Sequence, residues 1–366
     1  MRWETNAAGS ELPGPGDHRP VGDERSSLDL FLAPLRGLFG DEQVSEICIN
    51  RPGEAYVERA SGWSRVPLQF ASYQWCLLLA KLVANFTRQR VSATEPLLSA
   101  TLADGARVQI VVPPATEEGT VSITIRRPSS ALWSLEQLRE RGVFDDTRAL
   151  PTPAPDALAA SSRGDPHAQE LTSLLLTRDF VAFLRHAVRS RKNILLSGAA
   201  GSGKTTVAKA LMLEVPPEDR IVTIEDVREL SLRNQPNHVR LFSSLGGPGT
   251  GAVTPCQLLE SARRQRPDRV FVSELRAGDE TYEYLASVNT GHPGSIASVH
   301  ADSADLAFIA LAQLMKRADA GRGMSTREGI ELAQSSVDVV VQCSRARHRR
   351  FVSEIWYDPG AKRRGT

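Results

Sequence analysis

Residues 194–205 read ILLSGAAGSGKT, an apolar run that passes directly into a glycine-rich segment. The run predicts a short buried strand, and the apolar spacing from Lys204 to Leu213 predicts a helix. The segment between them has the spacing Gly-x-x-x-x-Gly-Lys-[Ser/Thr] of a phosphate-binding loop, in the strand–loop–helix context that such a loop requires. The alternative is a glycine-rich turn that binds no ligand.

The loop sequence suits phosphate binding because glycines allow successive backbone N–H groups to turn toward one point. The helix that follows adds unpaired N–H groups and the positive end of its dipole. We expect Lys204 to reach the β- and γ-phosphates of a nucleotide and Thr205 to ligate Mg²⁺. The residues expected to bind the nucleotide are Gly198, Ala199, Ala200, Gly201, Ser202, Gly203, Lys204, Thr205 and Thr206.

The composition excludes several classes of protein. The 366 residues carry 44 Lys and Arg against 43 Asp and Glu, so the net charge of +1 creates no global attraction to nucleic acid or anionic membranes. The four cysteines lie far apart without a Cys-x-x-Cys pair, which argues against a disulfide framework or a four-cysteine zinc site. No apolar run approaches the roughly 18 residues of a spanning helix, and the N-terminus lacks a signal-peptide core. We therefore expect a soluble or peripherally attached protein.

The first part of the chain predicts a small α+β domain over residues 29–145, after a disordered arm at 1–28 that is rich in glycine, proline and charge. A helical pattern runs over 28–39 and a second over 72–88. Strands are predicted at 44–50, 54–58, 63–66 and 120–126, and Asp104-Gly105 predicts the turn of a hairpin.

Residues 146–170 contain four prolines among alanine and serine, which predicts a flexible linker, or alternatively an ordered surface loop. From 171 to 366 helices alternate with strands, including strands at 193–197, 221–225, 269–274 and 295–300 and a single helix at 171–188. This alternation indicates an α/β domain with a mostly parallel sheet and helices on both faces.

Two acidic residues follow apolar strands downstream of the loop. Glu225 ends the strand 221–225, and Glu274 ends the strand 269–274. Because carboxyl ends of parallel strands face the ligand crevice, both acids are candidates for contact with the phosphates, although acids at such positions also cap helices. His300 ends a further strand at the same edge, with His292 upstream, and spacing alone does not separate these histidines from structural ones.

Together these segments resemble the type II/type IV secretion ATPase superfamily. The phosphate loop corresponds to its Walker A motif, 223–230 (TIEDVREL) to its Asp box, 266–276 (RPDRVFVSELR) to its Walker B motif and 291–300 (GHPGSIASVH) to its His box. The ending 352–359 (VSEIWYDP) and the segment 119–129 (GTVSITIRRPS) resemble the type IV secretion, conjugation-type branch. The four-cysteine zinc motif of many type II members is missing from the sequence.

The resemblance implies a RecA-like P-loop ATPase domain with a smaller α+β N-terminal domain above it. It also implies that ATP and Mg²⁺ bind between the two domains. It implies a homohexamer at the cytoplasmic face of the inner membrane, working with inner-membrane secretion or pilus assembly proteins to export protein or protein–DNA substrates. The neutral charge balance and the lack of a basic stripe interleaved with aromatic residues argue against direct sequence-specific nucleic acid binding. By motif position the catalytic residues would be Glu225, Glu274 and His300, with His292 in support.

In the family that this sequence resembles, arginines of the N-terminal domain also reach the phosphates of the nucleotide. Arg107 and Arg126 match these best, and Arg127 is an alternative to Arg126; the alternative role for all three is that of solvated strand residues. Ser273 stands where the family usually has glycine, and the Walker B strand contains no Asp, so we expect water-mediated acids to assist Thr205 in holding Mg²⁺.

Two alternative functions fit the same motifs. The protein could be an ATPase of pilus or type II secretion assembly, or it could be a scaffold that binds nucleotide without hydrolysing it. A basic cluster at 345–350, with further basic residues at 362–364, is either a solvated hairpin tip and tail or a contact for anionic lipid or a partner.

Overall fold

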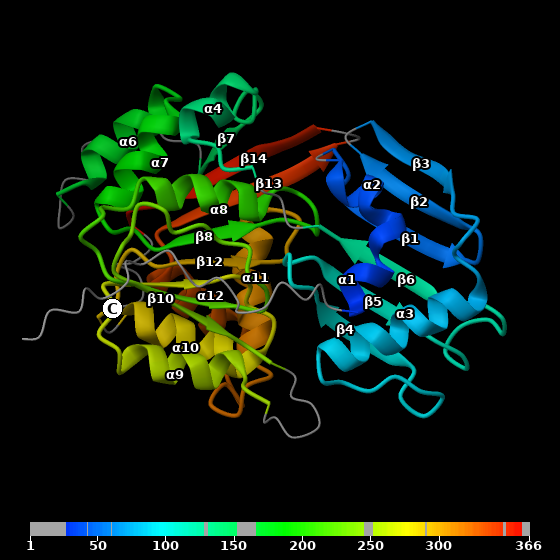
Figure 1. Ribbon diagram of the computed structural model, residues 1–366. Helices are drawn as coiled ribbons and strands as arrows, with labels where there is room; N and C mark the ends of the chain where they lie inside the picture. Colours follow the sequence, from blue (N-terminus) through cyan, green and yellow to red (C-terminus); the bar gives the residue numbers. More distant parts are fainter. Residues whose placement is uncertain are drawn as a thin grey trace, which may run out of the picture.

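The computed structural model describes residues 27–41, 43–59, 61–127, 131–151, 166–244, 252–289, 291–346 and 349–360. The predicted N-terminal arm therefore lies almost wholly outside the described residues, as do most of the predicted linker and residues 347, 348 and 362–364 of the basic cluster. Two β-sheets organise the described chain, a six-stranded one and an eight-stranded one (Figure 1).

The N-terminal sheet is antiparallel, with strand order β3-β2-β1-β6-β5-β4. Its strands are β1 (Glu46–Arg51), β2 (Glu54–Arg59), β3 (Gly62–Pro67), β4 (Leu97–Thr101), β5 (Arg107–Val111) and β6 (Ser122–Arg126). The predicted strands and the hairpin at Asp104-Gly105 are confirmed. Asp104 accepts a hydrogen bond from the Ala106 N–H, which stabilises that turn.

Helices α1 (Ser27–Phe31), α2 (Arg36–Gly40) and α3 (Tyr73–Phe86) pack on this sheet and share one apolar core with it. The prediction of one continuous helix over 28–39 was wrong, since Pro34 lies in a short 3-10 turn, η1 (Ala33–Leu35), between α1 and α2. Proline lacks the N–H that an interior helical position must donate.

The C-terminal sheet has the order β10-β9-β11-β12-β8-β13-β14-β7, in which every neighbouring pair is parallel except β13 and β14. Its strands are β7 (Arg148–Leu150), β8 (Ile194–Ser197), β9 (Ile221–Glu225), β10 (His238–Phe242), β11 (Arg269–Val272), β12 (Ile296–Val299), β13 (Val339–Ala346) and β14 (Arg349–Tyr357). The predicted mostly parallel sheet is confirmed.

Alternation along the central strands divides the core into two layers. Ile194 and Leu196 of β8 face one apolar cluster, and Leu195 between them faces the other. The first layer contains α4 (Leu135–Glu140), α6 (Ala168–Leu176), α7 (Phe180–Arg189) and α8 (Lys204–Leu213), and the second contains α9 (Pro255–Arg263), α10 (Gly278–Asn289), α11 (Ala304–Met315) and α12 (Thr326–Ser336).

Three further predictions differ from the structure. The single helix over 171–188 is two helices, α6 and α7, because Arg178 adopts a left-handed conformation with φ 58° and Asp179 then caps α7. Strand β10 was not predicted; it is a short edge strand without a fully buried residue. Strand β7 lies inside the segment predicted as a linker, where Arg148–Leu150 pairs with β14.

A buried ion pair holds the start of β11. The Arg269 Nε lies 2.7 Å from the Asp219 Oδ2, with side chains 1% and 6% exposed, and Arg269 also donates to the Val188 carbonyl. Burying two charges is unfavourable, so the pair stabilises the fold only while both partners are present.

We therefore predict that Asp219→Ala lowers the free energy of unfolding by about 3–5 kcal/mol, because it strands a buried guanidinium. The matched control is Glu331→Gln, which breaks the surface ion pair between Arg327 (88% exposed) and Glu331 (49% exposed) and should leave the free energy of unfolding nearly unchanged. Urea unfolding of the full chain measures both values. Similar losses in the two variants would contradict the role given to Asp219.

Candidate nucleotide site

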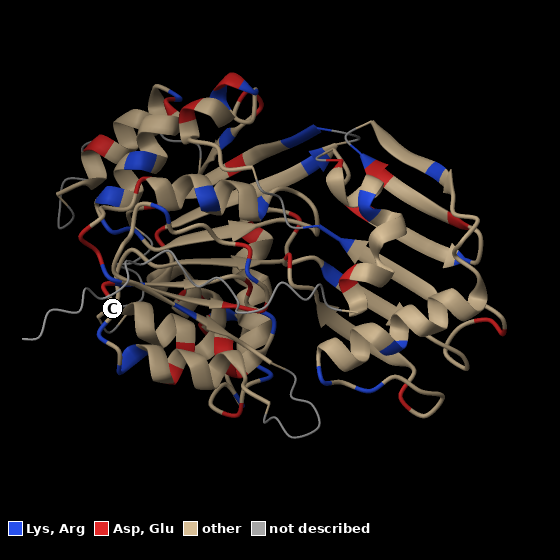
Figure 2. Cartoon of the chain, viewed as in Figure 1, with Lys and Arg blue, Asp and Glu red and all other residues tan. Residues whose placement is uncertain are grey.

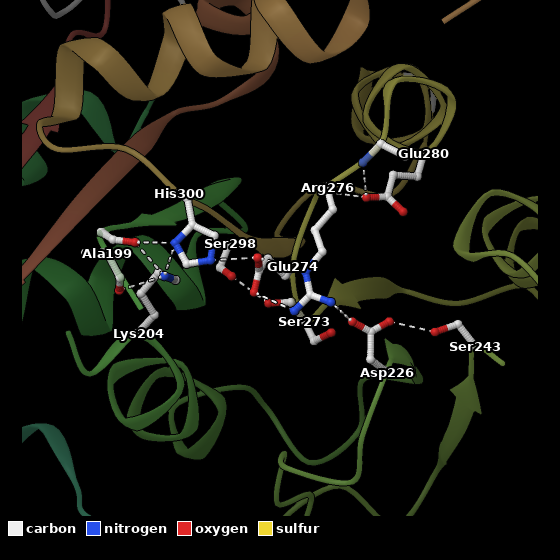
Figure 3. A network of polar contacts seen from close by, with 12 residues as sticks. Ala199, Lys204, Asp226, Ser243, Ser273, Glu274, Arg276, Glu280, Ser298 and His300 are labelled. Carbon is white, nitrogen blue, oxygen red and sulfur yellow. Dashed lines mark hydrogen bonds and ion pairs between the residues drawn. The ribbon is translucent and has the colours of Figure 1, made fainter. Parts of the chain in front are cut away.

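The glycine-rich loop connects β8 to the N-terminus of α8, as the sequence predicts. Gly198, Gly201 and Gly203 have φ values of 145°, 72° and 103°, a region that L-residues with side chains seldom adopt. The Lys204 Nζ donates to the carbonyls of Gly198 (2.5 Å) and Ala199 (3.1 Å) and so lies across the loop (Figure 3). Burial lowers the pKa of Lys204, while the Glu274 charge acts in the opposite direction.

Thr205 is connected to the N-terminal domain through one carboxylate. Its hydroxyl donates to the Glu229 Oε2 (3.1 Å), and the Glu229 Oε1 lies 2.9 Å from the Arg107 Nη2 of β5. The Arg107 Nε is buried and finds no hydrogen-bond acceptor among the described residues. Arg107 of the N-terminal domain and the Thr205 hydroxyl therefore both contact the carboxylate of Glu229. No sequence pattern had singled out Glu229.

Glu274 and His300 lie together beside Lys204. The His300 Nε2 is 2.8 Å from the Glu274 Oε1, and its Nδ1 is 3.0 Å from the Gly198 carbonyl and 3.3 Å from the Lys204 Nζ (Figure 3). A neutral ring protonated at Nε2 accepts from Lys204 at Nδ1, whereas a doubly protonated ring donates to the Gly198 carbonyl instead. The His300 ring therefore lies between the Lys204 ammonium group and the Glu274 carboxylate.

Arg276 holds the carboxylate of Glu274 from the other side. Its Nε and Nη2 donate to the two Glu274 oxygens at 2.9 and 3.0 Å, and its Nη1 donates to the Asp226 Oδ2 at 2.5 Å. Asp226 accepts a further hydrogen bond from Ser243 (Figure 3). Burial acts to raise the pKa of Glu274, but the Arg276 hydrogen bonds and the charges of His300 and Lys204 bring that pKa below its ordinary value.

Glu225 occupies a different environment from Glu274. Its side chain is fully buried, and Arg240 donates to both of its oxygens at 2.9 Å. It also accepts from the Thr223 hydroxyl and from the N–H groups of Glu229 and Leu230. These contacts fix the segment that carries Glu229, so that Glu229 and not Glu225 contacts the loop.

The remaining predicted residues are placed as follows. Arg126 of β6 lies close enough to Lys204 and Arg350 that its positive charge lowers the pKa of both side chains. Arg127 instead donates to the carbonyls of Asp41 (2.5 Å) and Val44 (3.5 Å) inside the N-terminal domain. His292 lies before β12, with its Nδ1 3.1 Å from the Pro267 carbonyl, and makes no contact with His300 among the interactions that the structure gives. Thr206 follows Thr205 in α8 and is partly exposed.

A small cavity of about 30 Å³ lies between α8 and the ends of the central strands. Lys204, Thr205 and Glu229 line it together with apolar side chains and with Ser273 and Ser298. The fold and this loop define a P-loop nucleotide-binding protein, because donors, a lysine and a hydroxyl converge at the carboxyl ends of the strands of an α/β sheet.

Comparison with known proteins narrows this class. The family model described as "Type II/IV secretion system protein" matches residues 167–356. A relative from Bartonella quintana (strain Toulouse), "Type IV secretion system protein VirB11", is 41% identical over 333 residues, covering 91% of this chain and 93% of its own. The chain therefore belongs to the type II/IV secretion system protein family, among its type IV secretion ATPases, and the resemblance stated from the sequence is confirmed.

Solved structures agree with this fold. The VirB11 ATPase from the Brucella suis type IV secretion system, in complex with sulphate, is 40% identical and covers 93% of this chain and 96% of its own with a TM-score of 0.51. The Legionella pneumophila ATPase DotB has a TM-score of 0.55 at 14% identity, covers 91% of this chain and 81% of its own, and shares the fold. In the part of the chain that the structure describes, no helix is long and apolar enough to cross a membrane.

We predict that Arg276→Gln raises the pKa of Glu274, because burial then acts without the opposing hydrogen bonds. In the wild type the pKa of Glu274 lies below its ordinary value of 4.5, so the stabilisation by Arg276 is present above that pH and is lost as the pH falls through the folded-state pKa. We expect the variant to be less stable by about 1 kcal/mol at pH 7, since Arg276 is half exposed and water screens the pair.

Urea unfolding at a series of pH values measures this difference. The gap in the free energy of unfolding between wild type and variant should narrow as the pH falls below 4.5. A gap that is the same at all pH values would show that Arg276 acts by packing and not through the Glu274 carboxylate.

Proposed function

We propose that the protein is a Mg²⁺-dependent ATPase that works as a homohexameric ring, peripheral to the cytoplasmic face of the inner membrane, and powers type IV secretion. The observation that carries the proposal is the continuous set of contacts from Lys204 through His300 to Glu274. This set joins the residue suited to bind the terminal phosphates to the carboxylate suited to activate water. Family membership supports the choice of secretion as the process.

When ATP binds, Lys204 first exchanges its hydrogen-bond partners within the protein for phosphate oxygens. Lys204 is bonded to two loop carbonyls, and ATP offers it more highly charged acceptors, so we expect its ammonium group to move onto the β- and γ-phosphates. The loop N–H groups and the α8 N-terminus bind the remaining oxygens. Departure of Lys204 frees His300 Nδ1, which then lies beside the γ-phosphate.

Mg²⁺ fits this site through oxygen donors. Among the described residues no group of three His, Cys, Asp or Glu side chains forms a metal site by itself. Thr205 and Glu229, whose oxygens already lie 3.1 Å apart, would hold the ion directly or through water, in keeping with its preference for few protein ligands. When bound, Mg²⁺ neutralises charge on the phosphate oxygens.

Glu274 is the proposed general base. Its carboxylate is ionised at neutral pH because Arg276, His300 and Lys204 lower its pKa, so it is able to orient and deprotonate the attacking water. Arg276 fixes both oxygens of that carboxylate. We propose that Glu225 acts by holding the segment of Glu229 in place, which replaces the catalytic role predicted for it.

Arg107 and Arg126 connect the chemistry to motion. Both come from the N-terminal sheet, where they are paired across β5 and β6, and Arg107 already reaches the loop through Glu229. We propose that they contact the γ-phosphate, so that ATP binding closes the two domains and phosphate loss opens them. In a ring such movements would act on secretion proteins at the membrane and on the exported protein or protein–DNA substrate.

We predict that Lys204→Ala lowers ATP turnover at least about 100-fold, because it removes the charge that binds the terminal phosphates. Steady-state phosphate release with Mg²⁺ measures it, and light scattering with and without nucleotide gives the mass of the assembly. Turnover near the wild-type rate in this variant would refute the proposed site. A wild type that binds nucleotide without releasing phosphate would identify a scaffold and not a motor.

We predict that Glu274→Gln keeps the affinity for ATP within about threefold but lowers kcat about 100-fold or more, since the amide is uncharged and is a poor base. Glu260→Gln, an exposed acid on α9, is the matched control and should turn over normally. Equal rates for wild type and Glu274→Gln would exclude Glu274 as the base.

A further inference from the structure

The outer side of the phosphate loop is covered by the β13–β14 hairpin. A Cβ atom on Gly198 would lie 2.2 Å from the Cys343 carbonyl oxygen, so the loop and β13 are as close as backbones allow. A Cβ on Gly201 would lie 3.5 Å from the Arg345 Nη1, and one on Gly203 would lie 3.7 Å from the Arg350 Cβ. The hairpin thus follows the loop from its first glycine to its last.

Arg350 makes a direct hydrogen bond to the loop. Its Nε donates to the Gly201 carbonyl at 2.9 Å. In a loop that turns its N–H groups toward phosphate, carbonyls such as this one face outward, and a charged donor on the carbonyl restricts rotation of the peptide unit. Burial lowers the pKa of Arg350, with the nearby Arg345 and Arg126 charges acting in the same direction, so several cations are held together behind the loop.

Arg345 joins the hairpin to the N-terminal domain. Its Nη2 lies 2.7 Å from the Glu58 Oε1 of β2, and the Glu58 side chain is 10% exposed. Burial acts to raise the pKa of Glu58, but hydrogen bonds from Arg345 and Ser45 bring that pKa below its ordinary value, so the pair is charged at neutral pH. Figure 2 shows basic positions on the hairpin facing acidic positions of the N-terminal sheet.

We propose that the β13–β14 hairpin transmits the position of the N-terminal domain to the phosphate loop. Arg350 is a positioning residue that keeps the loop in its phosphate-binding conformation, and the Glu58–Arg345 pair couples that conformation to domain closure. The inference rests on the proposed ATPase function. It assigns a role to the basic cluster, in which Arg345 and Arg350 support the nucleotide-binding loop and are not merely solvated residues at the tip of a hairpin.

The first test measures the dissociation constant of Mg-ADP for the full chain by calorimetry. We expect Arg350→Gln to weaken binding about tenfold, because a charged hydrogen bond that orders the loop is lost. Arg350→Lys, which keeps a charged donor, should recover part of the affinity. The matched control is Arg349→Gln, since Arg349 lies on the same strand but binds Asp146 and the Gly142 carbonyl.

The outcomes separate this inference from the proposed function. If the wild type binds no nucleotide, the proposed function fails. If the wild type binds but Arg350→Gln and Arg349→Gln bind equally well, the positioning role is wrong while the function stands. Thermal unfolding of the same variants should show equal melting temperatures, and a loss confined to Arg350→Gln would assign the effect to folding and overturn the proposal.

The second test is a double-mutant cycle on kcat/KM. We expect Glu58→Gln to lower kcat/KM about fivefold in the wild-type background and to have no further effect in Arg345→Gln, because the pair is then already broken. The exchange Glu58→Arg with Arg345→Glu should restore activity that either reversal alone removes. Additive effects of the two single changes would overturn the coupling.

Discussion

The structure depends on a phosphate loop whose backbone N–H groups must be held toward one point, although peptide dipoles so arranged repel one another when no anion is bound. Two devices satisfy this constraint in the described structure. Lys204 crosses the loop and binds the carbonyls of Gly198 and Ala199, and Arg350 binds the carbonyl of Gly201 from behind. An anion with several negative charges is therefore the natural partner of this arrangement.

The acids around the loop divide into structural and reactive ones according to their surroundings. Glu225 has its hydrogen-bonding capacity filled by Arg240, a hydroxyl and two N–H groups, and it organises the chain around it. Glu229 and Glu274 are instead partly exposed, and each contacts a side chain that we propose binds the nucleotide or its Mg²⁺. Because Glu225 is buried with all of its hydrogen bonds made, it is suited to a structural role, whereas the partly exposed Glu229 and Glu274 are suited to contact a ligand.

The sequence predicted the fold better than the site. Apolar periodicity and the glycine-rich motif were sufficient for the loop, for both sheets and for most helices, while local breaks at Pro34 and Arg178 were missed because they depend on single-residue backbone preferences. Glu274 was selected because it follows an apolar strand, whereas His300 was selected through the resemblance to the family's His box; in the structure they lie just beyond the ends of β11 and β12. Partners far along the chain could not be found in this way; Glu58 and Arg345 are 287 residues apart, and no local pattern records their contact.

We propose that the terminal phosphate of ATP joins the two domains. Hydrogen–deuterium exchange with Mg²⁺ and a non-hydrolysable ATP analogue, compared with ADP, is the decisive experiment. We expect slower exchange in 198–213 with either nucleotide, and slower exchange in 105–127 of the N-terminal sheet with the triphosphate alone. Protection confined to the loop and α8 with both nucleotides would contradict it.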